Sequence, residues 1–221
     1  MIPVLRTKLD RQTPFGFSCK QCLQCCTAKK IQVNPYEIAR LARNLDISTT
    51  AFIARYTVHN GSFLQTTHNK TCLFLGAEGC LVHADRPLVC RLYPLARHVN
   101  HKGDEWFSEL QPEQGCRGIH KKTGTIENYL EEQGATPYML AANSYLNLLW
   151  EMMTILESTT QDDKDGTEEP ENTMVENGQL MDMDAALNIY CQERELRVPR
   201  SVEKKMQMHL EALYLWTKEK P

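Results

Sequence analysis

The chain has 221 residues, of which 24% are charged and 42% hydrophobic, and its formal net charge is −3. This composition is typical of a soluble globular protein and argues against a general affinity for nucleic acid or anionic membranes. The sequence has no run of about 18 apolar residues and no signal-peptide pattern, so we expect a cytoplasmic protein without a membrane segment. Nine cysteines are the unusual feature, and in a reducing compartment they favour metal binding over disulfides.

Charge and cysteine content change together near residue 122. Residues 1–122 contain 17 Lys and Arg against 9 Asp and Glu, a net charge of +8, and hold eight of the nine cysteines. Residues 123–221 contain 8 Lys and Arg against 19 Asp and Glu, a net charge of −11. The basic excess of the first part either attracts an anionic partner or offsets the negative charge of a metal–thiolate site, and we favour the second interpretation.

The first predicted elements are helices. Asn34 is a suitable N-cap, Pro35 suits the first helical position, and Glu37 stands where a capping box requires it. Ser48 predicts the cap of a second, shorter helix. The stretch TCLFLGAEGCLVH at 71–83 contains two short apolar runs separated by glycines, which indicates a hairpin within otherwise irregular backbone.

Helical patterns dominate after residue 122. We expect a helix from Thr125 to Gln133, a long helix from Thr136 to about Glu157, and helices near 184–196 and 201–219. The predicted buried stripe of the long helix contains Leu140, Leu146, Leu149, Met153 and Leu156. The predicted fold is therefore mainly α, with an irregular cysteine-rich metal-binding core that includes a short hairpin, and a C-terminal helical extension.

The predicted organisation has four parts. They are a cysteine-cluster metal-binding domain at 1–122, a helical pair packed on it at 123–157, an acidic disordered linker at 158–180 and C-terminal helices at 181–221. The linker is predicted from its acidity and its lack of large apolar residues.

The cysteine pattern is the strongest chemical signal. Cys19-Lys-Gln-Cys22-Leu-Gln-Cys25-Cys26 places four thiols in eight residues, and C-x₂-C spacing allows two sulfurs to bind one ion. The doubled spacing is similar to the run that wraps an iron–sulfur cluster. The eight predicted metal ligands are Cys19, Cys22, Cys25, Cys26, Cys72, Cys80, Cys90 and Cys116. They suffice for two four-coordinate zinc sites or for one cluster with spare thiols, whereas Cys191 is expected to be a core thiol.

These segments resemble a known family. CKQCLQCC, then CLFLGAEGCLVHADRPLVCRLYPL, then a further Cys, resemble the YkgJ-like cysteine-cluster family, described as zinc- or iron-chelating with the pattern CxxCxxCC. The resemblance covers about residues 15–120. It implies a bound iron–sulfur cluster or zinc and a bacterial cytoplasmic setting. Some relatives are flagellin lysine N-methylases, so the resemblance also implies methyl transfer to protein lysine. Family members often have Tyr where this chain has His83.

Four further residues are expected to act near the metal without binding it. Arg86 and Arg91 flank Cys90 and could donate hydrogen bonds to thiolate sulfurs. Tyr93 is either a proton donor or a packing residue, with packing favoured. His83, three residues after Cys80, either completes a Cys/His site or, as we favour, is satisfied elsewhere.

Two classes of function follow. In the first, an iron–sulfur cluster, [4Fe–4S] favoured, or zinc carries redox or protein-lysine methyl-transfer chemistry, although no glycine-rich nucleotide loop is visible. In the second, a structural zinc stabilises an interaction module without catalytic activity. The expected partner is a protein or a protein substrate, with no nucleic acid and no membrane; the sequence does not specify the oligomeric state.

Overall fold

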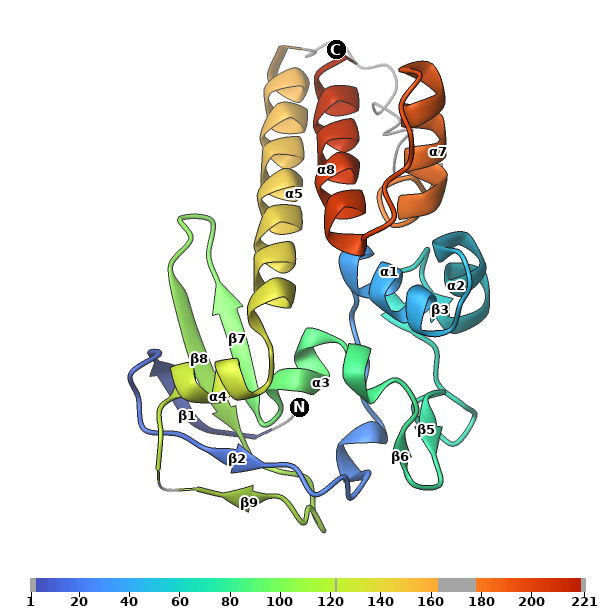
Figure 1. Cartoon of the computed structure of the whole chain (residues 1–221). Coiled ribbons are helices and arrows are strands. Elements are labelled where there is room, and N and C mark those ends of the chain that lie inside the picture. Colours follow the sequence, from blue (N-terminus) through green and yellow to red (C-terminus); the bar gives the residue numbers. More distant parts are fainter. Residues whose placement is uncertain (1–2, 122, 163–177, 220–221) are drawn as a thin grey trace. The chain divides into compact units, whose positions relative to one another are not determined.

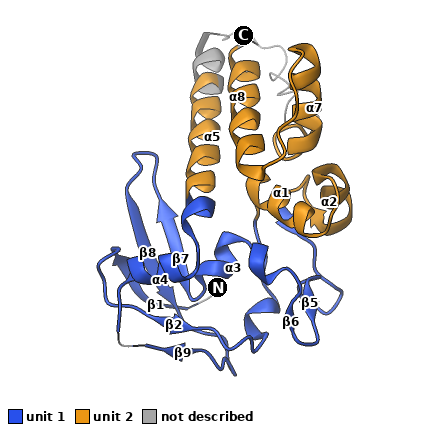
Figure 2. Cartoon of the chain, viewed as in Figure 1, with its two compact units in different colours: residues 1–32, 63–139 blue, residues 33–62, 140–221 orange. Residues whose placement is uncertain are grey.

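In the computed structural model, the chain forms two compact units (Figures 1 and 2). The described residues are 3–121, 123–162 and 178–219. Unit 1 contains residues 1–32 and 63–139, and unit 2 contains residues 33–62 and 140–221. The chain thus leaves unit 1 after residue 32, forms the first helices of unit 2 and returns at residue 63. These units differ from the predicted division near residue 122, because segment 33–62 joins the C-terminal helices and segment 123–139 joins the cysteine-rich part.

Unit 1 contains a three-stranded antiparallel sheet in the order β1–β8–β7, formed by Val4–Leu9, Glu105–Leu110 and Leu95–Val99. Leu95 and Phe107 are buried against the rest of the unit. The prediction of a mainly α fold is therefore wrong for unit 1, which is mixed. The sheet escaped prediction because all of the β1 side chains except Leu9 are exposed, so this strand shows no apolar alternation.

The remaining elements of unit 1 are short. They are β2 (Phe17–Ser18), the 3₁₀ turn η1 (Gln24–Cys26), β4 (Phe63–Leu64), β5 (Leu75–Gly76), β6 (Gly79–Cys80), η2 (His83–Asp85), α3 (Leu88–Leu92), β9 (Ile119–His120) and α4 (Ile126–Glu132). The antiparallel pair β5–β6 confirms the hairpin. The side chain of Thr125 caps α4, and Gly134 follows α4 in a left-handed conformation, as expected for a C-terminal glycine.

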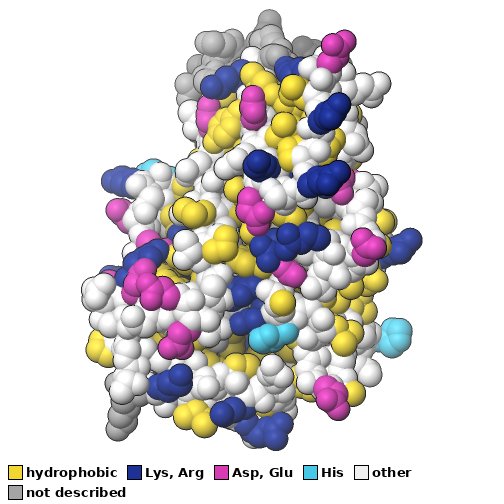
Figure 3. Space-filling model, viewed as in Figure 1, with side chains coloured by type: hydrophobic (Ala, Val, Ile, Leu, Met, Phe, Trp, Pro, Cys, Tyr) yellow, Lys and Arg dark blue, Asp and Glu magenta, His cyan; other side chains and the backbone are white. Residues whose placement is uncertain are grey.

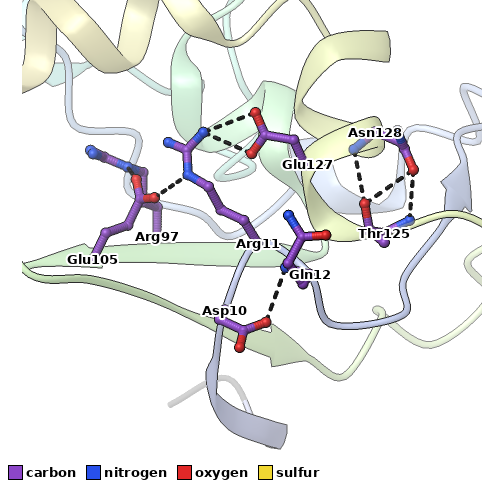
Figure 4. A network of polar contacts seen from close by, with 8 residues as sticks. All are labelled: Asp10, Arg11, Gln12, Arg97, Glu105, Thr125, Glu127 and Asn128. Carbon is purple, nitrogen blue, oxygen red and sulfur yellow. Dashed lines mark hydrogen bonds and ion pairs between the residues drawn. The ribbon is translucent and has the colours of Figure 1, made fainter.

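Ion pairs connect the sheet to α4 (Figure 4). Arg11 donates from Nε to the Glu105 carboxylate at 2.7 Å and from Nη1 to Glu127 on α4 at 2.8 Å, while Arg97 on β7 also binds Glu105. Burial alone would raise the pKa of Glu105, but the two guanidinium groups hold it below its ordinary value. The network fixes the chain before β2 against the sheet.

The backbone also brings two distant cysteine segments together. The amide of Cys72 donates to the carbonyl of Cys26 at 2.9 Å, and the amide of Ala28 donates to the carbonyl of Lys70 at 2.7 Å. Thr27 and Thr71 form an isolated bridge between these hydrogen bonds. The CKQCLQCC loop and the Cys72 segment are therefore adjacent in space.

Unit 2 is helical. It contains α1 (Pro35–Asn44), α2 (Thr49–Tyr56), β3 (Thr57–Val58), most of α5 (Thr136–Asp162), α7 (Met183–Glu193) and α8 (Val202–Glu219). The predicted capping box is confirmed, because Asn34 and Glu37 exchange side-chain and backbone hydrogen bonds. The starts of α2 and α7 cap each other: the Thr49 amide donates to Asp184 at 2.9 Å, and the Asp184 amide donates to the Thr49 hydroxyl at 2.8 Å.

The buried face of α5 differs from the predicted stripe. Leu140, Leu149 and Met153 are 60%, 38% and 56% exposed, whereas the buried positions are Tyr138, Met139, Ala141, Tyr145, Leu148 and Met152. The predicted Leu146 is half-buried, and the side chain of Leu156 lies outside the described residues. Two apolar stripes compete on this helix. The one with two tyrosines is buried, where the Tyr145 hydroxyl has a hydrogen-bond partner and the Tyr138 ring stacks on a guanidinium.

Helix α5 extends to Asp162 and so includes the first five residues of the predicted linker at 158–180. Residues 163–177 of that prediction lie outside the described residues. None of the described helices combines the length and the apolar composition needed to span a bilayer.

Unit 2 contains one fully buried histidine, His209 on α8. Its Nε2 lies 3.0 Å from the carbonyl oxygen of Gln179, and its Nδ1 lies 2.9 Å from the Tyr145 hydroxyl. A carbonyl only accepts, so Nε2 carries the proton and Tyr145 donates to Nδ1. Burial lowers the pKa of His209 to about 4.

We expect the free energy of unfolding to decrease as the pH falls from about 6.5 toward 4. In this range the unfolded histidine binds a proton and the folded one does not, so stability present above pH 6.5 is lost, by about 3 kcal/mol for the whole shift. Urea denaturation followed by circular dichroism measures this. His209→Gln should flatten the pH dependence, whereas His101→Gln, at an exposed position, should not. Equal slopes for His209→Gln and the unchanged protein would contradict the assignment.

Candidate metal centre

All eight cysteines predicted to bind metal lie in unit 1, and Cys191 lies in unit 2. Cys191 is buried on α7, with its sulfur 3.5 Å from that of Met208, and it is a core thiol as expected. None of the nine cysteines, all of which lie among the described residues, forms a disulfide. Of the eight in unit 1, Cys19 and Cys90 are exposed and the other six are half-buried.

Six of the eight thiols share one electrostatic neighbourhood centred on Cys25. The charge of Cys25 acts on five other thiols, which are Cys22, Cys26, Cys72, Cys80 and Cys116. Cys90 acts on Cys26 as well, and both Cys19 and Cys90 act on Arg86. The fold therefore gathers thiols from four separate segments of the chain into one region of unit 1.

Backbone amides point at most of these sulfurs in a repeated pattern. The amide two residues after the cysteine donates to its sulfur in two cases, from Gln21 to Cys19 at 3.3 Å and from Gly118 to Cys116 at 3.4 Å. At the same spacing, the amides of Gln24, Phe74 and Val82 act to lower the pKa values of Cys22, Cys72 and Cys80. The amide of Arg117 also donates to Cys22, at 3.4 Å. Amide donors stabilise the thiolate over the thiol, and the thiolate is the form that binds metal.

The CKQCLQCC loop has a strained backbone. Gln21 and Leu23 have φ angles of 48° and 70°, a left-handed conformation that non-glycine residues avoid at a cost of about 1–2 kcal/mol each. Such strain persists only where surrounding contacts enforce it, and it is concentrated at functional sites. The amide donors described above are among those contacts.

Two pairs of thiols share hydrogen bonds. The Cys26 thiol donates to Cys25 and, with Lys29 nearby, lowers the pKa of Cys25 to about 7, although burial opposes the change; the same interaction raises the pKa of Cys26. Burial also opposes ionisation of Cys22, but amide donors and the Cys116 thiol lower its pKa. Burial raises the pKa values of Cys72, Cys80 and Cys116.

Within the described part of the chain, no three His, Cys, Asp or Glu side chains already stand as ligands around a common ion position. Two pairs of these thiols, Cys25 with Cys26 and Cys22 with Cys116, interact with each other through a thiol proton. The donor set nevertheless fits zinc or iron, because both accept soft thiolate ligands. Metal binding would replace the shared protons, so it should release protons and draw the loops together.

Arg86 and Arg91 connect α3 to α4. Arg86 donates to the side-chain oxygen of Gln133 at 2.8 Å, and Arg91, which is only 7% exposed, donates to the carbonyl of Gln133 at 2.7 Å and to that of Ala84 at 2.8 Å. Arg91 also stacks on the Tyr138 ring, 4.2 Å from its centre. Among the described residues, neither guanidinium group pairs with a carboxylate. Both guanidinium groups therefore have neutral hydrogen-bond partners, and Arg86 lies within electrostatic range of Cys19 and Cys90.

His83 and Tyr93 both form hydrogen bonds with other residues of unit 1. Arg86 donates to the His83 carbonyl at 2.7 Å and lies 3.2 Å from Nδ1, so Nδ1 is an acceptor and the neutral ring carries its proton on Nε2. Burial and both arginines lower the pKa of His83. The Tyr93 hydroxyl accepts from the Glu113 amide at 2.8 Å, and burial raises its pKa to about 12. Tyr93 therefore keeps a proton that it can donate.

Sequence reasoning missed three residues of this region. Lys29 pairs with Glu113 and lowers the pKa of Cys25, and the only signal was the Lys-Lys dipeptide just after the motif. Tyr129 on α4 donates to the carbonyl of Tyr93 at 2.8 Å and lies within electrostatic range of Cys19 and Cys25. No local pattern links Tyr129 to cysteines that lie about 100 residues earlier.

Comparison with known proteins gives two matches. A family model described as "CxxCxxCC: Putative zinc- or iron-chelating domain" matches residues 18–129. An uncharacterized protein of Methanocaldococcus jannaschii is 29% identical over 124 residues, which is 52% of this chain and 64% of that protein. The chain thus covers less than two thirds of this relative. No solved structure matches the chain significantly.

We expect Gly118→Ala to destabilise unit 1 and weaken metal binding. A Cβ at this position would lie 2.0 Å from the Phe17 ring, so the ring must move, and overpacking of this kind costs about 1–3 kcal/mol. The shift would also move the amide that donates to Cys116. Thermal unfolding and metal content measure the two effects, and Phe17→Leu in the same chain should relieve them.

Gly103→Ala is the matched control for this prediction. Its added Cβ would meet no atom within 4 Å, so only the strain of its left-handed backbone should appear. A Gly118→Ala protein as stable as the Gly103→Ala protein would show that the Phe17 contact does not constrain the site.

Proposed function

Because the chain belongs to the CxxCxxCC family, we propose that unit 1 binds an iron–sulfur cluster, with [4Fe–4S] favoured over zinc, through thiolates of its cysteine segments. The observation that carries the proposal is the electrostatic proximity of Cys25 to five other thiols from separate segments, together with the amides of Gln21 and Gly118, which donate to the sulfurs of Cys19 and Cys116. Such a region contains far more thiolate donors than a single structural zinc requires. When bound, the cluster would supply redox chemistry.

The choice of iron–sulfur over zinc rests on the C-x₂-C-x₂-C run. One loop with three evenly spaced thiols suits three corners of a cubic cluster, whereas zinc sites more often combine two separate C-x₂-C hooks. The half-buried position of six thiols supports the same choice, since a protein shell shields a cluster from water.

The two arginines fit an anionic centre. A [4Fe–4S]²⁺ cluster with four thiolates has a net charge of −2, and Arg86 lies within electrostatic range of Cys19 and Cys90. Arg91 is buried, with neutral carbonyl and ring partners. We infer that both arginines act as positioning residues that stabilise negative charge on the thiolates.

A zinc-stabilised interaction module is the second candidate. The two thiol pairs that share hydrogen bonds, Cys25 with Cys26 and Cys22 with Cys116, favour it, because each pair could begin a separate four-coordinate site. Methyl transfer to protein lysine, which the family resemblance implies, depends on the first candidate and loses its support if the bound metal is zinc.

Purification under anaerobic conditions with metal and sulfide analysis separates the two candidates. Brown protein that absorbs near ~400 nm and contains iron with acid-labile sulfide supports the cluster. Colourless protein with zinc at full occupancy overturns it and leaves the interaction module as the function.

We expect Cys22→Ser to remove or strongly deplete the metal, because it deletes a thiolate from the shared neighbourhood. Cys191→Ser should retain the full metal content, because Cys191 is buried in unit 2. Metal-to-protein ratios of the two variants, purified side by side, measure this. Equal loss of metal from both variants would mean that the site is not confined to unit 1.

We expect Arg91→Gln to lower the reduction potential of the cluster while the metal content stays the same. Loss of a nearby positive charge disfavours the more negative, reduced state. Arg91→Lys should move the potential less, because it keeps the charge, and Lys102→Gln in an exposed turn should not move it. A redox titration followed by electron paramagnetic resonance measures the reduction potential of each variant. Equal shifts in Gln and Lys variants would assign Arg91 a packing role only.

A further inference from the structure

Exposed apolar side chains stand next to two of the cysteines in the sequence. Leu81, which directly follows Cys80, is 70% exposed, and Val89, which directly precedes Cys90, is 49% exposed. Cys19 and Cys90 are linked through Arg86, which both thiols affect electrostatically. Gln21 of the cysteine loop lies against Gly79 of the β5–β6 hairpin, which leads into Leu81. The cysteine loop and the β5–β6 hairpin are therefore in contact, and Arg86 lies within electrostatic range of both exposed thiols.

Four exposed cations lie in the same cysteine segments. Lys20, Lys30, Lys70 and Arg117 all lie in the cysteine segments, all are exposed, and none pairs with a carboxylate among the described residues. The contacts of the main chain bring these segments together, since Arg117 donates its amide to Cys22 and the Lys70 carbonyl accepts from Ala28. We call these four residues the basic rim. On the face of the chain shown in Figure 3, basic, acidic and apolar side chains are interspersed.

The basic rim is poorly suited to stabilising the thiolates themselves. Exposed charges are screened by water and salt, and they contribute little to the stability of groups in the protein interior. Lys29 and Arg86, which are more buried, already serve that purpose. Unpaired exposed cations act mainly at longer range, where they attract and orient a negatively charged partner.

We propose that the surface formed by Leu81, Val89, Cys19, Cys90 and the basic rim is a docking face for an acidic protein. This inference rests on the proposed function, because a partner that exchanges electrons or metal with the cluster must approach its exposed edge. The charge of the rim is complementary to acidic side chains, and Leu81 and Val89 supply the apolar centre that protein interfaces usually have.

A nucleic acid fits this surface less well. Proteins that bind single strands without sequence preference usually stack bases on exposed aromatic rings. The large apolar side chains exposed in the described part of the chain include no Phe, Tyr or Trp. The negative net charge of the chain also disfavours a long polyanion.

The test uses the metal-loaded full chain and a labelled peptide of about twelve residues, rich in glutamate with two leucines. Fluorescence anisotropy gives its affinity at about 20 mM and about 200 mM NaCl, between which exposed charges become strongly screened. We expect binding that weakens with salt. Lys20→Glu combined with Arg117→Glu should weaken binding about tenfold at low salt, and Leu81→Ser should weaken it severalfold at both salt concentrations.

Two matched variants control for the charge reversal and for the loss of an apolar side chain. Lys102→Glu reverses an exposed charge in the turn between β7 and β8, and Val4→Ser removes an exposed apolar side chain from β1; both lie in unit 1 outside the cysteine segments. Neither should alter binding. Metal content is measured for every variant, so that loss of metal is distinguished from loss of docking.

Several outcomes would overturn the proposal. They are no binding of the acidic peptide to the metal-loaded protein, equal effects of the control and rim variants, and tighter binding of a lysine-rich peptide, of single-stranded RNA or of anionic vesicles. If the purified protein contains no metal, the proposed function fails instead, whatever the peptide does.

Discussion

Mutual repulsion and desolvation of thiolates is the constraint on which the rest of unit 1 depends. Six thiols that interact electrostatically cannot ionise together without compensation. Three compensating features are present: amides that donate to the sulfurs, positive groups such as Lys29 and Arg86, and protons shared between neighbouring thiols. The strained residues Gln21 and Leu23 show how far the backbone departs from its preferred conformations to provide the first of these.

The other elements of unit 1 hold the cysteine segments in place. The sheet β1–β8–β7 supplies a hydrogen-bonded framework, and the Arg11–Glu105–Glu127 network attaches α4 and the chain before β2 to it. Helix α4 in turn presents Gln133, which binds both Arg86 and Arg91. The short strands and 3₁₀ turns between these elements leave the backbone amides free to face sulfur. A more regular secondary structure would use those amides in its own hydrogen-bond ladder.

Unit 2 has its own apolar core and polar contacts. Ile38, Phe52, Leu187 and Leu213 are fully buried, and the reciprocal caps of α2 and α7 connect its early and late helices. Its buried polar pair, His209 with Tyr145, has a different function from the thiols, because it stabilises a neutral ring rather than an anion. Unit 1 therefore stabilises negatively charged thiolates, whereas unit 2 stabilises a buried neutral histidine.

The sequence by itself determined the local features. Asn34 and Glu37 specify a capping box, the glycines near Cys80 specify a hairpin, and the cysteine spacing specifies the family, because each depends on residues close together in the chain. Tertiary structure decided the rest. The exposed strand β1 forms only because β8 pairs with it, and α5 buries its tyrosine stripe because His209 and Arg91 offer partners from distant segments. Likewise, only the fold places Lys29 and Tyr129 among the thiols, since electrostatic contact depends on distance in space and leaves no pattern in the sequence.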